Sequence, residues 1–167
     1  FPKTAVHLNI EVASGEKLLL DEEVDIGIHG SLQANKNIDY RLIDTLNIPL
    51  VIAKSLVASI DSEMTENDLA KYPQVILKST DRHSPGKDII DETSKWYVTD
   101  QHTKKMLITK GLGWGRLPHH FVKEEINSGE LVVLKTLGEL NLPMYVTKLK
   151  NKPMGPVATK IWNYFND

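Results

Sequence analysis

The sequence contains no cysteine. This absence excludes disulfide bonds, thiolate metal ligands and a cysteine nucleophile, and it is compatible with a reducing compartment. No apolar run reaches the roughly 18 residues that a membrane-spanning helix needs. The first ten residues also lack the charged start and apolar block of a secretory signal. We therefore expect a cytoplasmic protein without a membrane segment.

An excess of positive charge is missing as well. The 20 Lys and Arg residues against 22 Asp and Glu residues give a formal net charge of -2, so no global positive field attracts nucleic-acid phosphates. What is present is an ordinary globular composition: 167 residues, 41% of them hydrophobic, suffice for one compact body or two small lobes. Because the chain begins with Phe1 at a strand-like pattern, we expect a fragment of a longer protein.

Strands and helices alternate along the predicted chain. Apolar and polar residues alternate over about 5–12, which predicts a strand, whereas 29–42 is polar and Asn-rich and predicts a loop. Further strands are predicted at 24–28, 48–53, 74–78, 96–98, 131–134 and 142–149. Helices are predicted at 16–23, 65–73, about 100–110, 119–128 and 154–165. This order predicts an α/β fold with mainly parallel sheets flanked by helices.

The glycine-rich segment GLGWGRLP, residues 111–118, has the composition of a nucleotide loop but not its position. A dinucleotide loop follows a strand and begins a helix, so that free amides face the phosphates. Here the order is reversed: Lys104, Lys105 and Lys110 favour the C-terminal half of a helix that Gly111 ends, and a strand follows. We therefore predict no nucleotide binding at this segment.

The segment GLGWGRLPHHFVKEEINSGELVVL resembles a part of the LysR-type transcriptional regulators. In that family a Gly-x-Gly turn, a strand ending in Leu-Pro, a helix and a Ser-Gly-x-Leu-Val-x-Leu strand follow one another. The pieces FPKTAVHLNIEV, VDIGI, DLAKYPQVIL and VTDQHTKKMLITKG resemble successive parts of the same regulatory domain. The resemblance covers nearly the whole chain.

The resemblance implies a two-lobed, periplasmic-binding-protein-like fold with an effector in the cleft between the lobes. Lobe I would take residues 1–50 and 139–167, and lobe II would take 51–138. The family's N-terminal winged helix-turn-helix and the first strand and helix of lobe I are absent from these 167 residues. We expect them to belong to the longer protein, and part of the effector site with them.

Candidate effector contacts follow from the rule that ligands in open α/β sheets lie beyond the carboxyl ends of the strands. The residues so placed are Ser14, His29, Ser79, Thr80 and Asp100. The hydroxyls and nearby amides of Ser14, Ser79 and Thr80 would suit a small carboxylate, with plain helix capping as the alternative. Asp100 is also a candidate cap; facing the cleft, it would favour an amine or polar neutral effector.

Trp114 is the sixth candidate, because Gly113 and Gly115 on either side leave space for the indole to cover a ligand; core packing is the alternative. The adjacent His119 and His120 point in different directions on a helix, so they cannot share a metal ion. No Gly-x-Ser-x-Gly nucleophile motif is present either. We predict no catalytic residue, no metal and no cofactor.

These features favour the effector-sensing and dimerisation domain of a bacterial LysR-type regulator. A small carboxylate or polar metabolite in the cleft would modulate DNA binding by the absent helix-turn-helix, and the protein would be a homodimer or homotetramer. An extracytoplasmic solute-binding protein of the same fold class is the alternative, and a small α/β enzyme is the third hypothesis.

Overall fold

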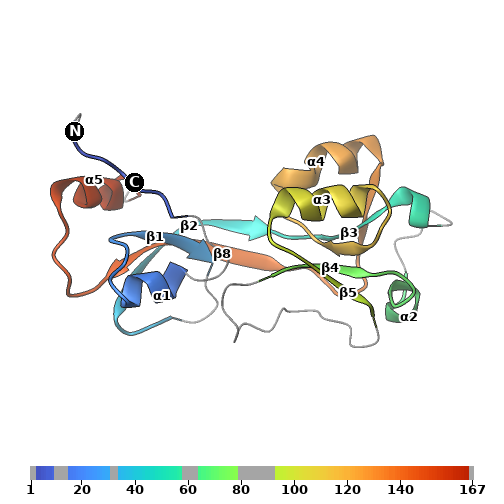
Figure 1. Cartoon of the computed structure of the whole chain (residues 1–167), viewed down its shortest axis with the longest axis horizontal. Coiled ribbons are helices and arrows are strands. Elements are labelled where there is room, and N and C mark those ends of the chain that lie inside the picture. The colour runs from blue at the N-terminus through green and yellow to red at the C-terminus, as the bar shows by residue number, and fades with distance from the viewer. Residues whose placement is uncertain (1–2, 10–14, 31–33, 58–63, 79–92, 166–167) are drawn as a thin grey trace. The chain divides into compact units, whose positions relative to one another are not determined.

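The computed structural model describes residues 3–9, 15–30, 34–57, 64–78 and 93–165. The chain forms two compact units. The first comprises Phe1–Thr45, Ser79–His83 and Leu142–Asp167, and the second comprises Leu46–Lys78 and Ser84–Asn141. Two of the unit boundaries fall within the strands β2 (Ile38–Asn47) and β8 (Asn141–Leu149), which therefore belong partly to each unit (Figure 1). The lobe boundaries inferred from the sequence stay a prediction.

The first unit is built on a three-stranded sheet in the order β1-β8-β2. Its other elements are β1 (Gly27–Gly30), α1 (Gly15–Leu20) and α5 (Pro156–Tyr164). β1 pairs antiparallel with β8, which places His29 opposite Tyr145. α1 packs against β1 and buries Leu19 completely. This small helix and sheet hold the candidate residue His29.

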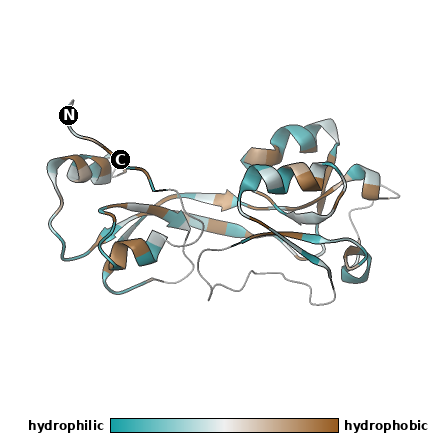
Figure 2. Cartoon of the chain, in the orientation of Figure 1, coloured by the Kyte–Doolittle hydropathy of each residue, from teal (hydrophilic) through white to brown (hydrophobic). Residues whose placement is uncertain are grey.

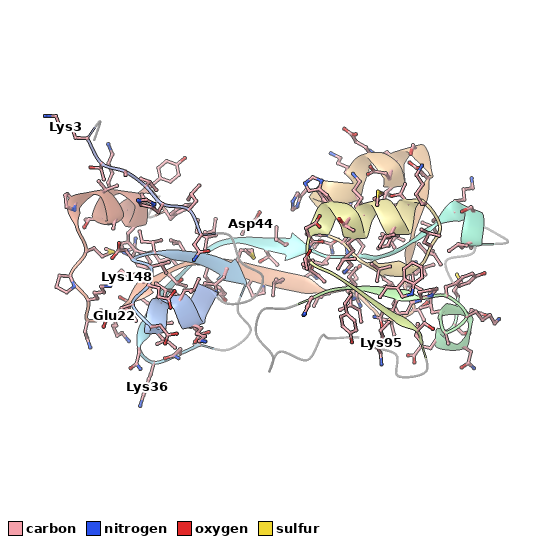
Figure 3. All side chains as sticks on the ribbon, in the orientation of Figure 1. Lys3, Glu22, Lys36, Asp44, Lys95 and Lys148 are labelled. Atoms are coloured by element: carbon pink, nitrogen blue, oxygen red, sulfur yellow. The ribbon has the colours of Figure 1, made fainter. Side chains whose placement is uncertain are left out.

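A cluster of charged and aromatic side chains holds α5 against the sheet of the first unit. The Arg41 guanidinium lies 3.9 Å from the centre of the Trp162 ring and donates a hydrogen bond of 2.9 Å to the Trp162 carbonyl. Lys148, labelled in Figure 3, lies 5.3 Å from the same ring and forms a 2.8 Å ion pair with Asp39. Because Trp162 is only 6% exposed, these cations cover a buried aromatic side chain.

The second unit is built on a five-stranded sheet in the order β5-β4-β6-β3-β7. Its elements are β3 (Leu50–Ala53), η1 (Lys54–Leu56), α2 (Glu66–Leu69), β4 (Gln74–Leu77), β5 (Lys95–Val98), α3 (Gln101–Thr109), β6 (Trp114–Arg116), α4 (His119–Ser128) and β7 (Leu131–Leu134). β4 is parallel to β5 and β6, whereas β3 is antiparallel to β6 and β7. The expectation of mainly parallel strands thus holds for β4 to β7. β3 is reversed because the chain enters this unit through β3 and leaves it through the neighbouring β7.

β3 forms the centre of the second unit and is buried on both faces. Val51 and Ala53 belong to a cluster with Ile108 of α3. Leu50 and Ile52 belong to a second cluster with Trp114 and with Leu69 of α2. Figure 1 shows α3 and α4 together over one face of this sheet, and Figure 2 shows the apolar character of its central strands. A strand covered on both sides is apolar throughout, as LVIA is.

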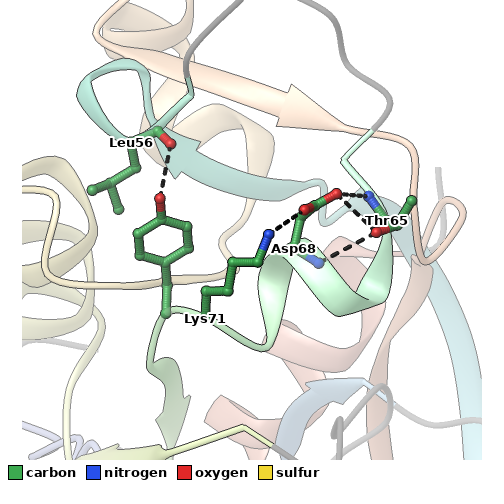
Figure 4. A network of polar contacts seen from close by, with 5 residues as sticks. Leu56, Thr65, Asp68 and Lys71 are labelled. Carbon is green, nitrogen blue, oxygen red and sulfur yellow. Dashed lines mark hydrogen bonds and ion pairs between the residues drawn. The ribbon is translucent and has the colours of Figure 1, made fainter.

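Local interactions mark the helix ends of the second unit, although α2, predicted over 65–73, ends at Leu69. Thr65 and Asp68 form a reciprocal capping box at the start of α2 (Figure 4). The hydrogen bond from Lys71, followed by those from Thr65, lowers the pKa of Asp68 to about 2. Gly111 and Gly129, with φ of 71° and 74°, end α3 and α4 as predicted, because these left-handed conformations favour glycine.

Three predictions for the first unit are wrong. Residues 5–9 form no strand, and Val6 and Leu8 are 61% and 84% exposed, because no described strand pairs with them; residues 10–12 lie outside the described chain. The predicted loop at 29–42 includes the start of β2, which pairs with β8 about a hundred residues away. The strand predicted as buried at 24–28 begins only at Gly27, and Ile28 is 59% exposed.

Candidate functional site

Asp100 caps the start of α3, directly after β5. One carboxylate oxygen accepts a 2.8 Å hydrogen bond from the Thr103 backbone N–H, and the other accepts a 2.8 Å hydrogen bond from the Thr103 hydroxyl. These bonds, the backbone one foremost, lower the pKa of Asp100. The capping role considered for Asp100 is confirmed. Its role in effector binding stays a prediction.

Lys104, one turn further along α3, is a buried cation that the sequence reasoning misplaced. It is 8% exposed and lies in the N-terminal half of the helix rather than near its negative end. Burial, followed by the repulsion of Arg116, lowers the pKa of Lys104 to about 8. One feature of the sequence did indicate that Lys104 is buried. It lies four residues before Ile108, which places both side chains on the core-facing side of the helix.

Gly113 and Gly115 bring β6 close to its neighbours instead of leaving open space. A Cβ atom on Gly113 would collide with the Pro73 carbonyl oxygen, and one on Gly115 would lie 2.7 Å from the Val75 carbonyl oxygen. The same Cβ on Gly115 would lie 3.2 Å from Cε of Lys104. The glycines therefore serve close packing between strands and beneath α3.

The predicted location of Trp114 at the mouth of a cleft is wrong. The side chain is 0% exposed, and its indole N–H donates hydrogen bonds to the carbonyls of Leu69 at 2.9 Å and Tyr72 at 3.2 Å. The indole therefore packs in the core next to α2. Its apolar surface is buried there, and its N–H is hydrogen-bonded. Core packing, the alternative, describes Trp114.

His29 lies in the first unit within a row of aromatic side chains. Its ring is edge-on to Tyr40, with centroids 6.4 Å apart, and Tyr40 is edge-on to Tyr145 at 5.6 Å. His29 Nε2 lies 3.0 Å from the Thr147 hydroxyl, which donates its hydrogen to the Gly27 carbonyl. Both ring nitrogens therefore have a polar neighbour, because Nδ1 lies 3.4 Å from the Gly30 carbonyl oxygen.

The other candidate residues, Ser14, Ser79 and Thr80, lie outside the described residues, so their roles stay predictions. Within the part of the chain that the structure describes, no three His, Asp or Glu side chains come together as a possible metal site. No helix there is long and apolar enough to cross a membrane. The described candidate groups are the capping carboxylate of Asp100, the imidazole of His29 and the buried ammonium group of Lys104.

Solved structures define the class of this fold. The bromide-bound regulatory domain of HypT from Salmonella typhimurium is 19% identical, with a TM-score of 0.66 over 94% of this chain and 78% of that chain. Full-length LysG from Corynebacterium glutamicum, with bound effector Arg, is 17% identical, with a TM-score of 0.69 over 93% of this chain and 55% of that chain. The fold is that of the regulatory domains of LysR-type transcriptional regulators.

A sequence comparison then assigns the family. The model of the LysR substrate binding domain matches residues 1–167, and the chain belongs to this family. The HTH-type transcriptional regulator PunR of Escherichia coli (strain K12) is 23% identical over 148 residues, which are 87% of this chain and 48% of PunR. The chain thus spans about half the length of that regulator. The resemblance inferred from the sequence is confirmed.

Proposed function

We propose that the chain is the effector-sensing and dimerisation domain of a cytoplasmic transcriptional regulator that contacts DNA through a helix-turn-helix outside these residues. The observation that carries this proposal is the match of the substrate-binding family over the whole chain. The relative PunR is named an HTH-type regulator, and LysG holds an effector, which favours sensing over solute capture or catalysis. An effector can shift DNA affinity only by its differential affinity for the two states of the regulator.

We propose that the effector, a small carboxylate or polar metabolite, contacts His29, Ser14, Ser79 and Thr80, and that Asp100 joins them where the effector presents an amine or a neutral polar group. The contact between Nε2 and the Thr147 hydroxyl supports the part of His29 in this set, because it holds the imidazole in one orientation. Trp114 is buried, so we propose that it acts on the site only by fixing α2 against β6. The position of the effector in a cleft between lobes stays a prediction.

The test combines binding and regulation. Small carboxylates, amines and amino acids, arginine included, are screened for stabilisation of this chain against heat, since a ligand that binds only the folded state raises its melting temperature. Each hit is then added to the full-length protein on its promoter DNA. We expect at least one hit to change DNA affinity, and sedimentation at micromolar concentration to show a dimer or tetramer.

The variants His29→Ala and His120→Ala form a matched pair, because His120 is an exposed histidine on α4. His29→Ala should weaken binding of a confirmed hit at least tenfold, whereas His120→Ala should not. The proposed function would be contradicted if the full-length protein regulated transcription fully and no compound changed its affinity for DNA.

A further inference from the structure

Lys104 is a buried lysine that the proposed effector contacts do not include. It lies on the face of α3 that also carries Gln101 and Ile108, at the i-3 and i+4 positions. This helix packs on β3 and β4, and Lys104 is 8% exposed. The ammonium group is therefore placed against the sheet by the same periodicity that buries Ile108.

Gly115 provides the room for this side chain. A Cβ atom at Gly115 would lie only 3.2 Å from Cε of Lys104, so the lysine stem passes over a position without a side chain. The glycine and the lysine come from different elements, β6 and α3. The missing side chain at Gly115 thus makes space for the Lys104 side chain in the second unit.

The ammonium group has no anionic partner among the described residues. No hydrogen bond or ion pair joins Lys104 to another described group, and the charge acting on it is that of Arg116, a second cation. The next residue shows the usual arrangement: Lys105 pairs with Glu125 at 2.5 Å and donates to the Phe121 carbonyl at 2.9 Å. Lys105 thus has acceptors for its ammonium group, whereas Lys104 has none among the described residues.

Among the described elements around α3, no carboxylate forms an ion pair or a hydrogen bond with Lys104. β3 and β4, with the sequences LVIA and QVIL, have no ionisable side chain, and β5 contributes only Lys95 and Tyr97. Asp100 uses both oxygens on Thr103. Glu125 of α4 is bound to Lys105, and its second oxygen has no hydrogen-bond partner in the described chain.

A buried ammonium group is costly unless acceptors replace its water. The pKa of about 8 still leaves Lys104 mostly protonated at pH 7. Gln101, one turn nearer the start of α3, also has a buried amide oxygen without a hydrogen-bond partner in the described chain. The Lys104 ammonium group thus lacks an acceptor and the Gln101 oxygen lacks a donor in the described chain; an anionic group of a ligand would supply the acceptor for Lys104 only.

We propose that Lys104 is the cationic anchor of an anion subsite in the second unit, and that the effector carries a carboxylate or phosphate group that pairs with it. This proposal rests on the effector-sensing function proposed above. It narrows the effector to a molecule with an anionic group, so a contact with Asp100 would require an amine or a neutral polar group elsewhere on the same molecule. It also adds a contact from within α3 to those expected at the ends of the strands.

The first test measures the ionisation of Lys104 in the wild-type chain by NMR, with labelled lysine side chains and with Lys104→Met to assign the signal. Acetate and inorganic phosphate are titrated at constant ionic strength, beside acetamide as a neutral probe. An anion that pairs with the ammonium group should bind saturably and raise its pKa by at least one unit, which corresponds to tenfold tighter binding to the protonated form. Acetamide should leave it unchanged.

The second test compares Lys104→Met with Lys123→Met, which removes an exposed lysine from α4. Lys104→Met should remain folded, because methionine keeps the length and removes the buried charge. Its affinity for the anion that binds the wild type should fall at least tenfold, whereas Lys123→Met should retain it. Tighter binding of acetate would indicate a carboxylate site, and tighter binding of phosphate would indicate a phosphate site.

Three results would overturn the anion subsite: an ordinary lysine pKa without added anion, no saturable change with either anion, or equal anion affinity in Lys104→Met. A neutral or cationic effector that binds the wild type and Lys104→Met alike would also overturn it, and would leave the effector-sensing function standing. Conversely, anion binding at Lys104 with no effect on DNA binding by the full-length protein would support the subsite and contradict the regulatory role.

Discussion

Replacing Trp114 by alanine should destabilise the second unit strongly. The indole is completely buried, and such a truncation typically lowers the free energy of unfolding by about 3 to 5 kcal/mol. The carbonyls of Leu69 and Tyr72 also lose their shared N–H donor. An unpaired buried acceptor adds on the order of 1 kcal/mol. We therefore expect a loss of about 4 kcal/mol or more, a large part of the 5 to 15 kcal/mol, in order of magnitude, that stabilises a typical domain.

Trp96→Ala is the matched control, because Trp96 is 40% exposed on β5 of the same unit. It should lower the free energy of unfolding by about 1 kcal/mol or less. Urea unfolding of wild type and both variants, followed by far-UV circular dichroism, measures the difference. Since the chain has two units, each transition is fitted separately, and the transition of the second unit should move in Trp114→Ala.

The reasoning fails if Trp114→Ala loses no more stability than Trp96→Ala. That result would mean that the indole is not a core residue of the second unit. A stable Trp114→Ala protein that also lost affinity for a confirmed effector would restore the direct binding role first inferred from GLGWG.

Three further predictions concern other elements. Because the pKa of Asp100 is lowered on folding, its stabilisation of α3 is present above its unfolded pKa and is lost as the pH falls through its folded pKa; Asp100→Asn, followed by unfolding at several pH values, should show a smaller acid-dependent loss. Gly115→Ala should destabilise by about 1 to 3 kcal/mol in urea unfolding, whereas Gly155→Ala, with open space around it, should stay within about 0.5 kcal/mol; equal effects would contradict the close packing of β6. Arg41→Leu should cost the first unit about 1 to 2 kcal/mol through the lost contacts with Trp162, and an unchanged melting curve would show that α5 is held otherwise.

The candidate site was predictable only in part. The cap at Asp100 followed from local sequence, because the carboxylate and the N–H that it binds are three residues apart. Helical periodicity indicated that Lys104 is buried, but the positive charge of this residue favoured the prediction of an exposed position near the end of the helix. The pairing of His29 with Thr147 joins residues 118 positions apart, and no pattern near either residue contains it.

The sequence by itself determined the family and most elements of the second unit, since helix caps, glycine stops and periodic burial act within a few residues. Only the tertiary structure decided that 38–42 is a strand and that Trp114 is core, because a strand needs a partner and a side chain is buried by whatever packs on it. For β2 the partner is β8, and for Trp114 the covering residues come from around α2. Both lie more than forty residues away in the chain, beyond the reach of any local pattern.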